Sequence, residues 1–173
     1  MTADRVLLAP GASGGIERLE RHERGLVARG FSVERVALPK GKAERALPVY
    51  AAALEREDAA ATVIGGHSFG GRVASMLAAE REVAALILLS YPLHAPGRQP
   101  TWEQRTEHWP RIGCPVLLLS GESDPFADIE LLRRAVDRLS QATLITYPGV
   151  GHDLGPVLDD ALDAIAEAVK RNS

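Results

Sequence analysis

Short apolar runs alternate with longer amphipathic stretches along the whole chain, and this alternation limits the folds that the chain can adopt. The apolar runs are dense in Val, Leu and Ile and mostly lack polar alternation, as strands buried on both faces of a parallel sheet do. They are Arg5–Ala9, Ser32–Leu38, Thr62–Gly65, Ala84–Ser90, Val116–Ser120 and Thr143–Tyr147. Helical periods lie between most of them. This order predicts an α/β fold with three layers, in which about six mainly parallel strands form a doubly wound sheet flanked by helices.

The size and charge of the chain restrict its organisation and its partners. A length of 173 residues suits one domain, so we expect a single domain over residues 1–173. The net charge of −3 gives no reason to expect nucleic acid or an anionic membrane as a partner. Cys114 is the only cysteine, and no apolar run has the length of a signal sequence or a membrane span. We therefore expect a cytoplasmic protein, whose oligomeric state the sequence does not specify.

The segment Thr62–Val73 contains the pattern Gly-x-Ser-x-Gly, with Ser68 at its centre, between a predicted strand and a predicted helix. A sharp turn in this position strains the serine backbone and lifts the hydroxyl clear of the sheet. The amino end of the following helix favours a developing oxyanion. These features predict that Ser68 is a nucleophile. The alternative is that Ser68 only caps the helix.

A serine nucleophile needs a base, and the base needs an acid that orients it. Asp124 and His152 each follow a predicted strand, and they come after Ser68 in the order that this fold uses. Because loops after parallel strands gather at one edge of the sheet, we expect the three side chains to meet there. Glu122 and Asp128 are alternative acids. Asp124 and His152 also suit purely structural roles in turns or helix caps.

The reaction also needs donors for the oxyanion. We expect one to be the backbone N–H of Phe69, the residue after the nucleophile. We expect the second from the glycine-rich loop that follows the first strand, with the N–H of Ala12 as the candidate. A phosphate-binding loop is the alternative, but its spacing matches neither common nucleotide-binding pattern.

A proline-rich segment, Tyr91–Gly113, is the one long stretch that we expect to be irregular. It follows the strand next to that of the nucleophile and should border the site. Tyr91, His94 and Trp102 are therefore candidates for a substrate-pocket wall. The alternative is that Trp102 and Trp109 simply anchor the loop to the core.

The remaining histidines suggest no metal centre. We expect His22 on the surface of the first helix and treat His67 as a variable position beside the nucleophile. No His, Cys or Asp cluster has metal-ligand spacing, so we expect neither a metal nor another cofactor.

Four segments carry a resemblance to the α/β-hydrolase superfamily, and within it to a small, lidless group related to dienelactone hydrolases. They are the turn Gly65–Arg72, the segments Tyr91–Gly97 and Arg105–His108, and the acid loop Gly121–Phe126. The resemblance covers essentially the whole chain. It implies a minimal α/β-hydrolase fold without a cap domain.

The resemblance also implies Ser68 as nucleophile, Asp124 as acid and His152 as base. The chain departs from the pattern where Pro10-Gly11 replaces the usual His-Gly of the oxyanion loop. Dienelactone hydrolases themselves use cysteine as nucleophile, so a serine argues against that reaction.

These observations predict a serine hydrolase that cleaves a small ester or thioester through an acyl-enzyme. The alternative is a binding or scaffold module that keeps the fold without turnover, a reading motivated by Pro10 and the missing cap. The sequence selects neither the acyl group nor the alcohol.

Overall fold

The computed structural model describes residues 4–171, which contain one six-stranded sheet. The strand order is β2-β1-β3-β4-β5-β6, and each neighbouring pair runs parallel. The strands are β1 (Arg5–Ala9), β2 (Ser32–Arg35), β3 (Thr62–His67), β4 (Ala85–Leu89), β5 (Val116–Gly121) and β6 (Ala142–Tyr147). The prediction of a doubly wound sheet is confirmed.

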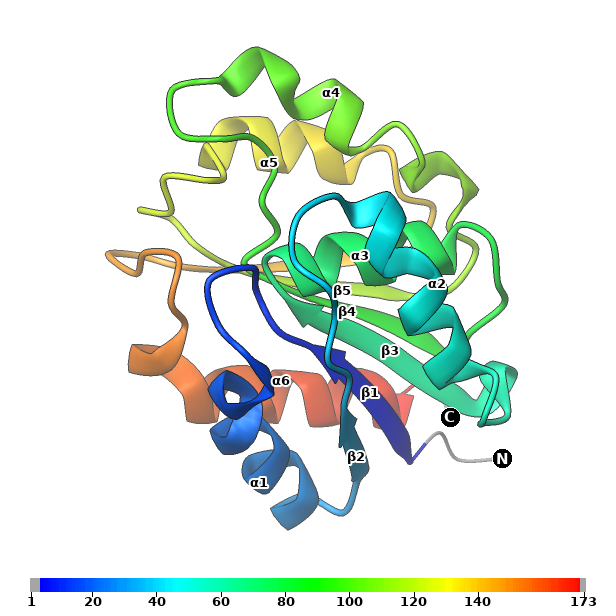
Figure 1. Cartoon of the computed structure of the whole chain (residues 1–173). Helices are drawn as coiled ribbons and strands as arrows, with labels where there is room; N and C mark the ends of the chain where they lie inside the picture. The colour runs from blue at the N-terminus through cyan, green and yellow to red at the C-terminus, as the bar shows by residue number, and fades with distance from the viewer. Residues whose placement is uncertain (1–3, 172–173) are drawn as a thin grey trace.

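Helices cover both faces of this sheet, giving three layers (Figure 1). One face carries α1 (Glu20–Ala28) and α6 (Leu158–Arg171). The opposite face carries α2 (Ala43–Leu54), α3 (Phe69–Ala78) and α5 (Ile129–Val136), with the short α4 (Trp102–Arg105) beyond α5.

Each face of the sheet has its own apolar core, because successive strand side chains point to opposite faces. Val63 of β3 packs with Leu26 of α1 and Leu162 of α6. Its neighbour Ile64 packs on the other side with Val73 and Leu77 of α3. The central strands are therefore buried on both faces, which explains their continuous apolar sequences.

The course of the chain through β1 creates the place where a site can form. β1 lies between β2 and β3, so the connections that leave β1 and β3 depart from neighbouring strands. α1 leaves toward one face of the sheet, and α3 leaves toward the other. Such a divergence opens a crevice at the carboxyl ends of the strands, where doubly wound proteins bind ligands.

Two predicted segments differ in the structure. The strand expected at Ser32–Leu38 ends at Arg35, although the Val36 N–H still donates to the Leu8 carbonyl at 2.8 Å. Beyond Leu38 the ladder cannot extend regularly, because Pro39 lacks an N–H and Gly41 turns the chain with a φ of 108°.

The segment Tyr91–Gly113 is more ordered than expected. It contains α4 and two short 3₁₀ turns, at Gln99–Thr101 and Trp109–Arg111. These short elements do not amount to a separate cap domain within residues 4–171. This agrees with the expected fold without a lid.

None of the helices between residues 4 and 171 is both long enough and apolar enough to cross a membrane.

Candidate active site

Ser68 occupies a strained turn between β3 and α3. Its φ of 52° and ψ of −118° lie in a region that non-glycine residues rarely adopt. The glycines on either side make this turn possible, because a Cβ at Gly66 or Gly70 would collide with the Ala9 carbonyl oxygen. The Ser68 N–H donates to the Leu89 carbonyl at 2.8 Å, which ties the turn to β4. The turn therefore has the geometry that the sequence pattern predicts.

The structure brings Ser68, His152 and Asp124 into one hydrogen-bonded array. His152 Nε2 lies 2.9 Å from Ser68 Oγ, and His152 Nδ1 lies 2.8 Å from Asp124 Oδ2. A carboxylate only accepts hydrogen bonds, so Nδ1 of neutral His152 carries the proton and Nε2 is free to accept from the hydroxyl. The Asp124 side chain is completely buried, whereas that of His152 is 25% exposed. The imidazole therefore links a buried acid to a partly exposed serine.

Close packing between two loops places the acid beside the histidine. Gly121 ends β5, and a Cβ there would collide with the carbonyl oxygens of Val150 and Gly151. The Ser123 N–H also donates to the Val150 carbonyl at 2.9 Å. These contacts hold the loop with Asp124 against the loop that precedes His152.

The alternative acids have other partners. Glu122 accepts a hydrogen bond from Thr146 Oγ1 at 2.7 Å. Asp128 caps α5, where its Oδ1 accepts from the N–H groups of Glu130 and Leu131. Asp124 also stabilises its own turn by accepting from the Phe126 N–H at 2.8 Å. The turn role predicted for Asp124 therefore coexists with its contact to the histidine.

The two loops expected to supply oxyanion donors converge on Ser68. Phe69 is the first residue of α3, so its N–H has no partner within the helix. Gly11 lies against Ser68, since a Cβ built on Gly11 would stand 3.5 Å from that of Ser68. Ala12 follows on the exposed side of the loop. The amides of Phe69 and Ala12 remain predicted donors.

Two residues that the sequence analysis did not assign to the site, His67 and Phe126, contact His152. The His67 side chain hydrogen-bonds the His152 carbonyl oxygen through Nε2 at 2.9 Å, and the two rings meet edge-on with centroids 5.0 Å apart. The Phe126 ring lies over His152 with a centroid separation of 4.5 Å. His67 comes directly before Ser68 in the sequence, and Phe126 comes two residues after Asp124. Their closeness in sequence to predicted site residues was the signal that could have identified them.

The three residues suggested for a pocket wall do not line the hollow beside His152. Tyr91 is buried and donates from its hydroxyl to the Arg105 carbonyl at 2.5 Å. His94 is also buried, and its Nε2 accepts from the Asp128 N–H at 2.8 Å. Trp102 packs under the guanidinium of Arg138, 4.7 Å from its ring centroid. These side chains hold the segment in place.

Trp109 supports the same interpretation. It is fully buried and contacts Tyr91 edge-on, with ring centroids 4.9 Å apart. The alternative prediction, that the tryptophans anchor this segment to the core, describes both of them.

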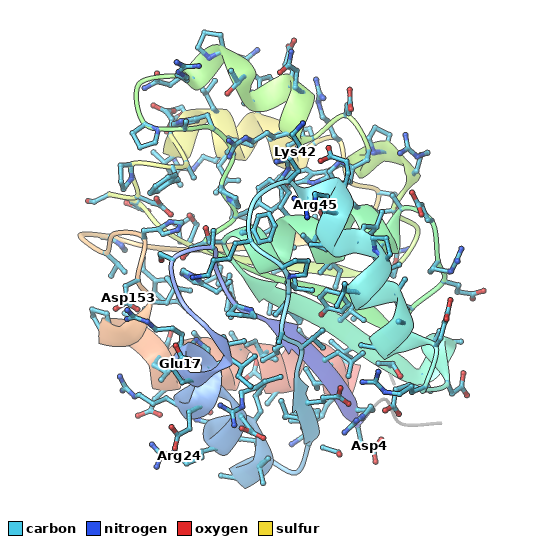
Figure 2. The ribbon with its side chains drawn as sticks, viewed as in Figure 1. Asp4, Glu17, Arg24, Lys42, Arg45 and Asp153 are labelled. Carbon is cyan, nitrogen blue, oxygen red and sulfur yellow. The ribbon has the colours of Figure 1, made fainter. Side chains whose placement is uncertain are left out.

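A hollow of about 560 Å³ adjoins His152 and His67. Its walls come from the loop after β1, the first turns of α1 and the loop around His152. Glu17 and Asp153 both border it and lie on the same side of the molecule (Figure 2). Each of these carboxylates accepts a hydrogen bond from a backbone N–H, so they also shape the walls of the hollow.

His22 is half-buried rather than freely exposed at the surface of the first helix. His22 lines this hollow, and its Nδ1 is buried. Burial lowers the pKa of His22 to about 4, and the neighbouring His67 contributes in the same direction. The start of α1 faces the loop around His152 rather than open solvent, which periodicity within a single helix does not reveal.

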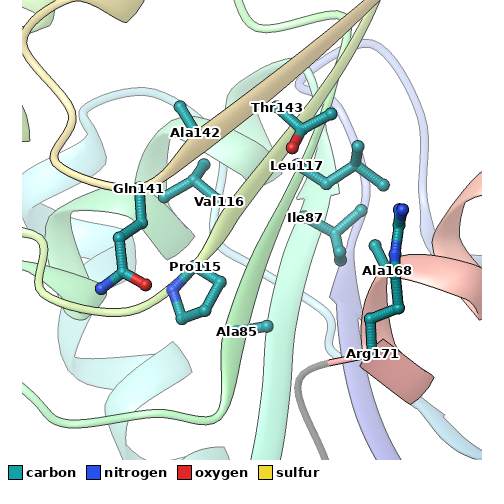
Figure 3. Close-up of a pocket in the computed structure, with 10 residues that line it drawn as sticks. All are labelled: Ala85, Ile87, Pro115, Val116, Leu117, Gln141, Ala142, Thr143, Ala168 and Arg171. Atoms are coloured by element: carbon teal, nitrogen blue, oxygen red, sulfur yellow. The ribbon is translucent and has the colours of Figure 1, made fainter.

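A second hollow, of about 350 Å³, lies at the opposite edge of the sheet (Figure 3). Ala85, Val116 and Ala142, which begin β4, β5 and β6, line it together with Arg171 at the end of α6. Its lining contains neither a serine nor a histidine. The array of Ser68, His152 and Asp124 therefore lies away from this hollow, at the carboxyl edge.

No group of three or more His, Cys, Asp and Glu side chains between residues 4 and 171 is arranged to hold a metal ion. The hydrogen-bonded array itself consists of a serine, a histidine and a carboxylate.

Known structures share this fold. A monoacylglycerol lipase from Paleococcus ferrophilus aligns with a TM-score of 0.83 and 19% identity, over 97% of this chain and 94% of that chain. An esterase from Pyrobaculum calidifontis aligns with a TM-score of 0.74 and 18% identity, over 96% and 76% of the two chains. A cold-adapted esterase from an Arctic intertidal metagenomic library gives 0.73 and 20%, over 97% and 84%.

Sequence comparison gives the family itself. A family model described as an alpha/beta hydrolase domain matches residues 4–169, nearly the whole chain. The narrower resemblance to dienelactone-hydrolase relatives stays a prediction. Because this match covers nearly the whole chain, the chain belongs to the α/β-hydrolase family.

Proposed function

We propose that this protein is a serine hydrolase that cleaves a small ester or thioester through an acyl-enzyme. The observation that carries the proposal is the continuous array from Ser68 Oγ through His152 to Asp124, with contacts of 2.9 and 2.8 Å. The array lies at a strained strand-to-helix turn, where a serine hydroxyl is accessible to substrate.

The first half of the reaction forms the acyl-enzyme. Ser68 Oγ attacks the substrate carbonyl carbon while its proton moves to His152 Nε2, and Asp124 stabilises the resulting imidazolium. The N–H groups of Phe69 and Ala12 hold the oxyanion of the tetrahedral intermediate. The intermediate then collapses, the bond to the leaving group breaks, and His152 gives its proton to the departing alcohol or thiol.

The second half regenerates the enzyme. Water loses a proton to His152 Nε2 and attacks the acyl carbon, which forms a second tetrahedral intermediate. This intermediate expels Ser68 Oγ, which recovers its proton from His152, and the free acid leaves.

The hollow beside His152 supports a small substrate. Its volume of about 560 Å³ lies within the usual range for small-molecule sites, and its position suits one half of a bound ester. The names of similar structures, a monoacylglycerol lipase and two esterases, favour ester hydrolysis over other reactions of the fold.

Labelling with a fluorophosphonate, which reacts with activated serines, tests the proposal. We expect covalent labelling of the wild-type protein at Ser68 and no labelling of Ser68→Ala. Ser75→Ala is the matched control, because Ser75 also contacts a histidine but lies buried within α3. A panel of oxyesters and thioesters with matched acyl groups then identifies the preferred bond.

An unlabelled, correctly folded wild-type protein without turnover on this panel contradicts the proposal. That result favours the alternative of a binding or scaffold module.

A further inference from the structure

The loop that carries His152 has little main-chain support of its own. Gly149, with a φ of 73°, and Gly151 lie just before the histidine. The Val150 carbonyl is held by the Ser123 N–H, but that contact precedes His152 by two residues. Asp124 fixes only the imidazole, so the main chain at His152 needs another anchor to keep Nε2 aimed at Ser68.

His67 provides that anchor. Among residues 4–171, the only hydrogen bond to the main chain of Gly151, His152 or Asp153 is the 2.9 Å contact from His67 Nε2 to the His152 carbonyl. A carbonyl oxygen only accepts, so His67 Nε2 carries a proton. Burial lowers the pKa of His67, although its hydrogen bond to the carbonyl opposes this shift. The favoured neutral form therefore has a proton on Nε2 and a lone pair on Nδ1.

The other side of the His67 ring faces the loop after β1. A Cβ built on Gly11 would stand 3.2 Å from His67 Nδ1, tighter than ordinary van der Waals contact. His67 thus lies between the loop expected to hold the oxyanion and the loop that carries the base. It is also joined covalently to Ser68, so one residue contacts both loops and adjoins the nucleophile.

We propose that His67 is a positioning residue, which holds the His152 main chain through its Nε2–H and spaces it from the loop at Gly11. The proposal rests on the proposed hydrolase function. In this role His67 neither touches the reacting atoms nor exchanges a proton with substrate. It fixes the distance between base and nucleophile, on which proton transfer from Ser68 depends.

A pair of amide substitutions tests the role of the hydrogen bond. In His67→Gln, the side-chain amide nitrogen lies as many bonds from Cα as Nε2 does in histidine, so it can still donate to the His152 carbonyl. In His67→Asn the amide nitrogen is one bond shorter and cannot reach. The two variants therefore differ mainly in the reach of one donor.

We expect His67→Asn to reduce the fluorophosphonate labelling rate and kcat by about 10- to 100-fold, with KM changed less than about threefold. His67→Gln should recover most of the labelling rate and of kcat. Thermal unfolding of both variants, measured in parallel, separates this effect from loss of fold. Equal rates for wild type and His67→Asn, or equally slow rates for the two variants when both are folded, overturn the proposal.

The tautomer of His67 gives a readout that does not depend on a variant. Nitrogen NMR of the wild-type protein with labelled histidine should find the His67 proton on Nε2 and a bare Nδ1. A bare Nε2 removes the donor and overturns the proposal even if His67→Asn fails to fold. A wild-type protein that is never labelled refutes the hydrolase function itself, whereas a labelled wild type with an equally fast His67→Asn refutes only the role of His67.

Discussion

The protein contains two serine–histidine pairs with nearly the same separation, and they have opposite characters. Ser68 Oγ lies 2.9 Å from His152 Nε2, and Ser75 Oγ lies 2.7 Å from His108 Nε2. Both serines belong to the segment around α3, seven residues apart in the sequence. A distance criterion alone would rank the second pair above the first.

The direction of the hydrogen bonds separates the pairs. Ser75 is fully buried, and its hydroxyl donates to the Arg72 carbonyl at 2.7 Å. A hydroxyl has one proton, so His108 Nε2 must donate to Ser75 Oγ rather than accept from it. Ser68 Oγ instead faces a histidine whose Nδ1 contacts a carboxylate, which leaves Nε2 free to accept.

The surroundings separate them further. No carboxylate forms an ion pair with His108 in the part of the chain that the structure describes. Burial lowers the pKa of His108 to about 4, and the charges of Arg72 and Arg111 act in the same direction. A base therefore needs a carboxylate on its far nitrogen and a nucleophile that substrate can reach, not only a short contact.

The largest expected effect comes from removing each serine in turn. Ser68→Ala should lower kcat by about 10⁴- to 10⁶-fold on any ester that the wild type cleaves. Ser75→Ala should retain kcat within about threefold, because Ser75 is outside the array. Steady-state kinetics on one substrate measures both, and a large loss of kcat in folded Ser75→Ala would reverse the comparison.

The second effect concerns the carboxylate that only one of the pairs possesses. Asp124→Asn should lower kcat by about 10⁴-fold, because an amide that donates to Nδ1 stabilises the wrong tautomer of His152. Asp128→Asn is the matched control, since asparagine caps a helix as well as aspartate does. Comparable kcat values for these two folded variants would remove Asp124 from the mechanism.

The contact between Ser68 and His152 was predictable from sequence, but the contact between Ser75 and His108 was not. Gly-x-Ser-x-Gly between a strand and a helix marked Ser68, and the chain order marked Asp124 and His152. The contact of His67 with the His152 carbonyl spans 85 residues and exists only because the loops meet at the sheet edge. Local patterns carry no information about such contacts.

The same limit applies to the peripheral residues, whose side-chain contacts the sequence did not reveal. Tyr91, His94 and Trp102 follow the strand beside the nucleophile, which suggested a pocket wall. Sequence position located their segment, but it did not show which way the side chains point. The partial burial of His22 was hidden for a similar reason, because the surface that faces it comes from the far end of the chain.

The third effect is a pH dependence of stability that comes from the structural pair. The unfolded state protonates His108 below about pH 6.5, whereas the folded state does so only near pH 4. The contribution of His108 to the free energy of unfolding is therefore fully present above about pH 6.5. It is lost progressively as the pH falls from there toward pH 4. The contribution of His108 should lower the free energy of unfolding by about 2 kcal/mol between pH 7.5 and pH 5.

Urea unfolding of wild type and His108→Gln at both pH values isolates this contribution, because glutamine donates to Ser75 but does not titrate. Between pH 7.5 and pH 5, the free energy of unfolding of the variant should fall by about 2 kcal/mol less than that of wild type. An identical pH dependence in both proteins would mean that His108 accepts a proton in the folded state as readily as in the unfolded chain.

The smallest effect is the loss of stability from breaking the buried Ser75–His108 pair without changing the Ser68–His152 pair. Ser75→Ala leaves the His108 Nε2–H without its acceptor inside the protein, which should lower the free energy of unfolding by about 1 to 2 kcal/mol at pH 7.5. His108→Gln should cost less, since the amide restores a donor to Ser75. Urea titrations at one pH measure both, and they sharpen the comparison because neither change should alter kcat. If Ser75→Ala were as stable as wild type, the 2.7 Å contact would contribute nothing to the fold, and the structural assignment of this pair would be lost.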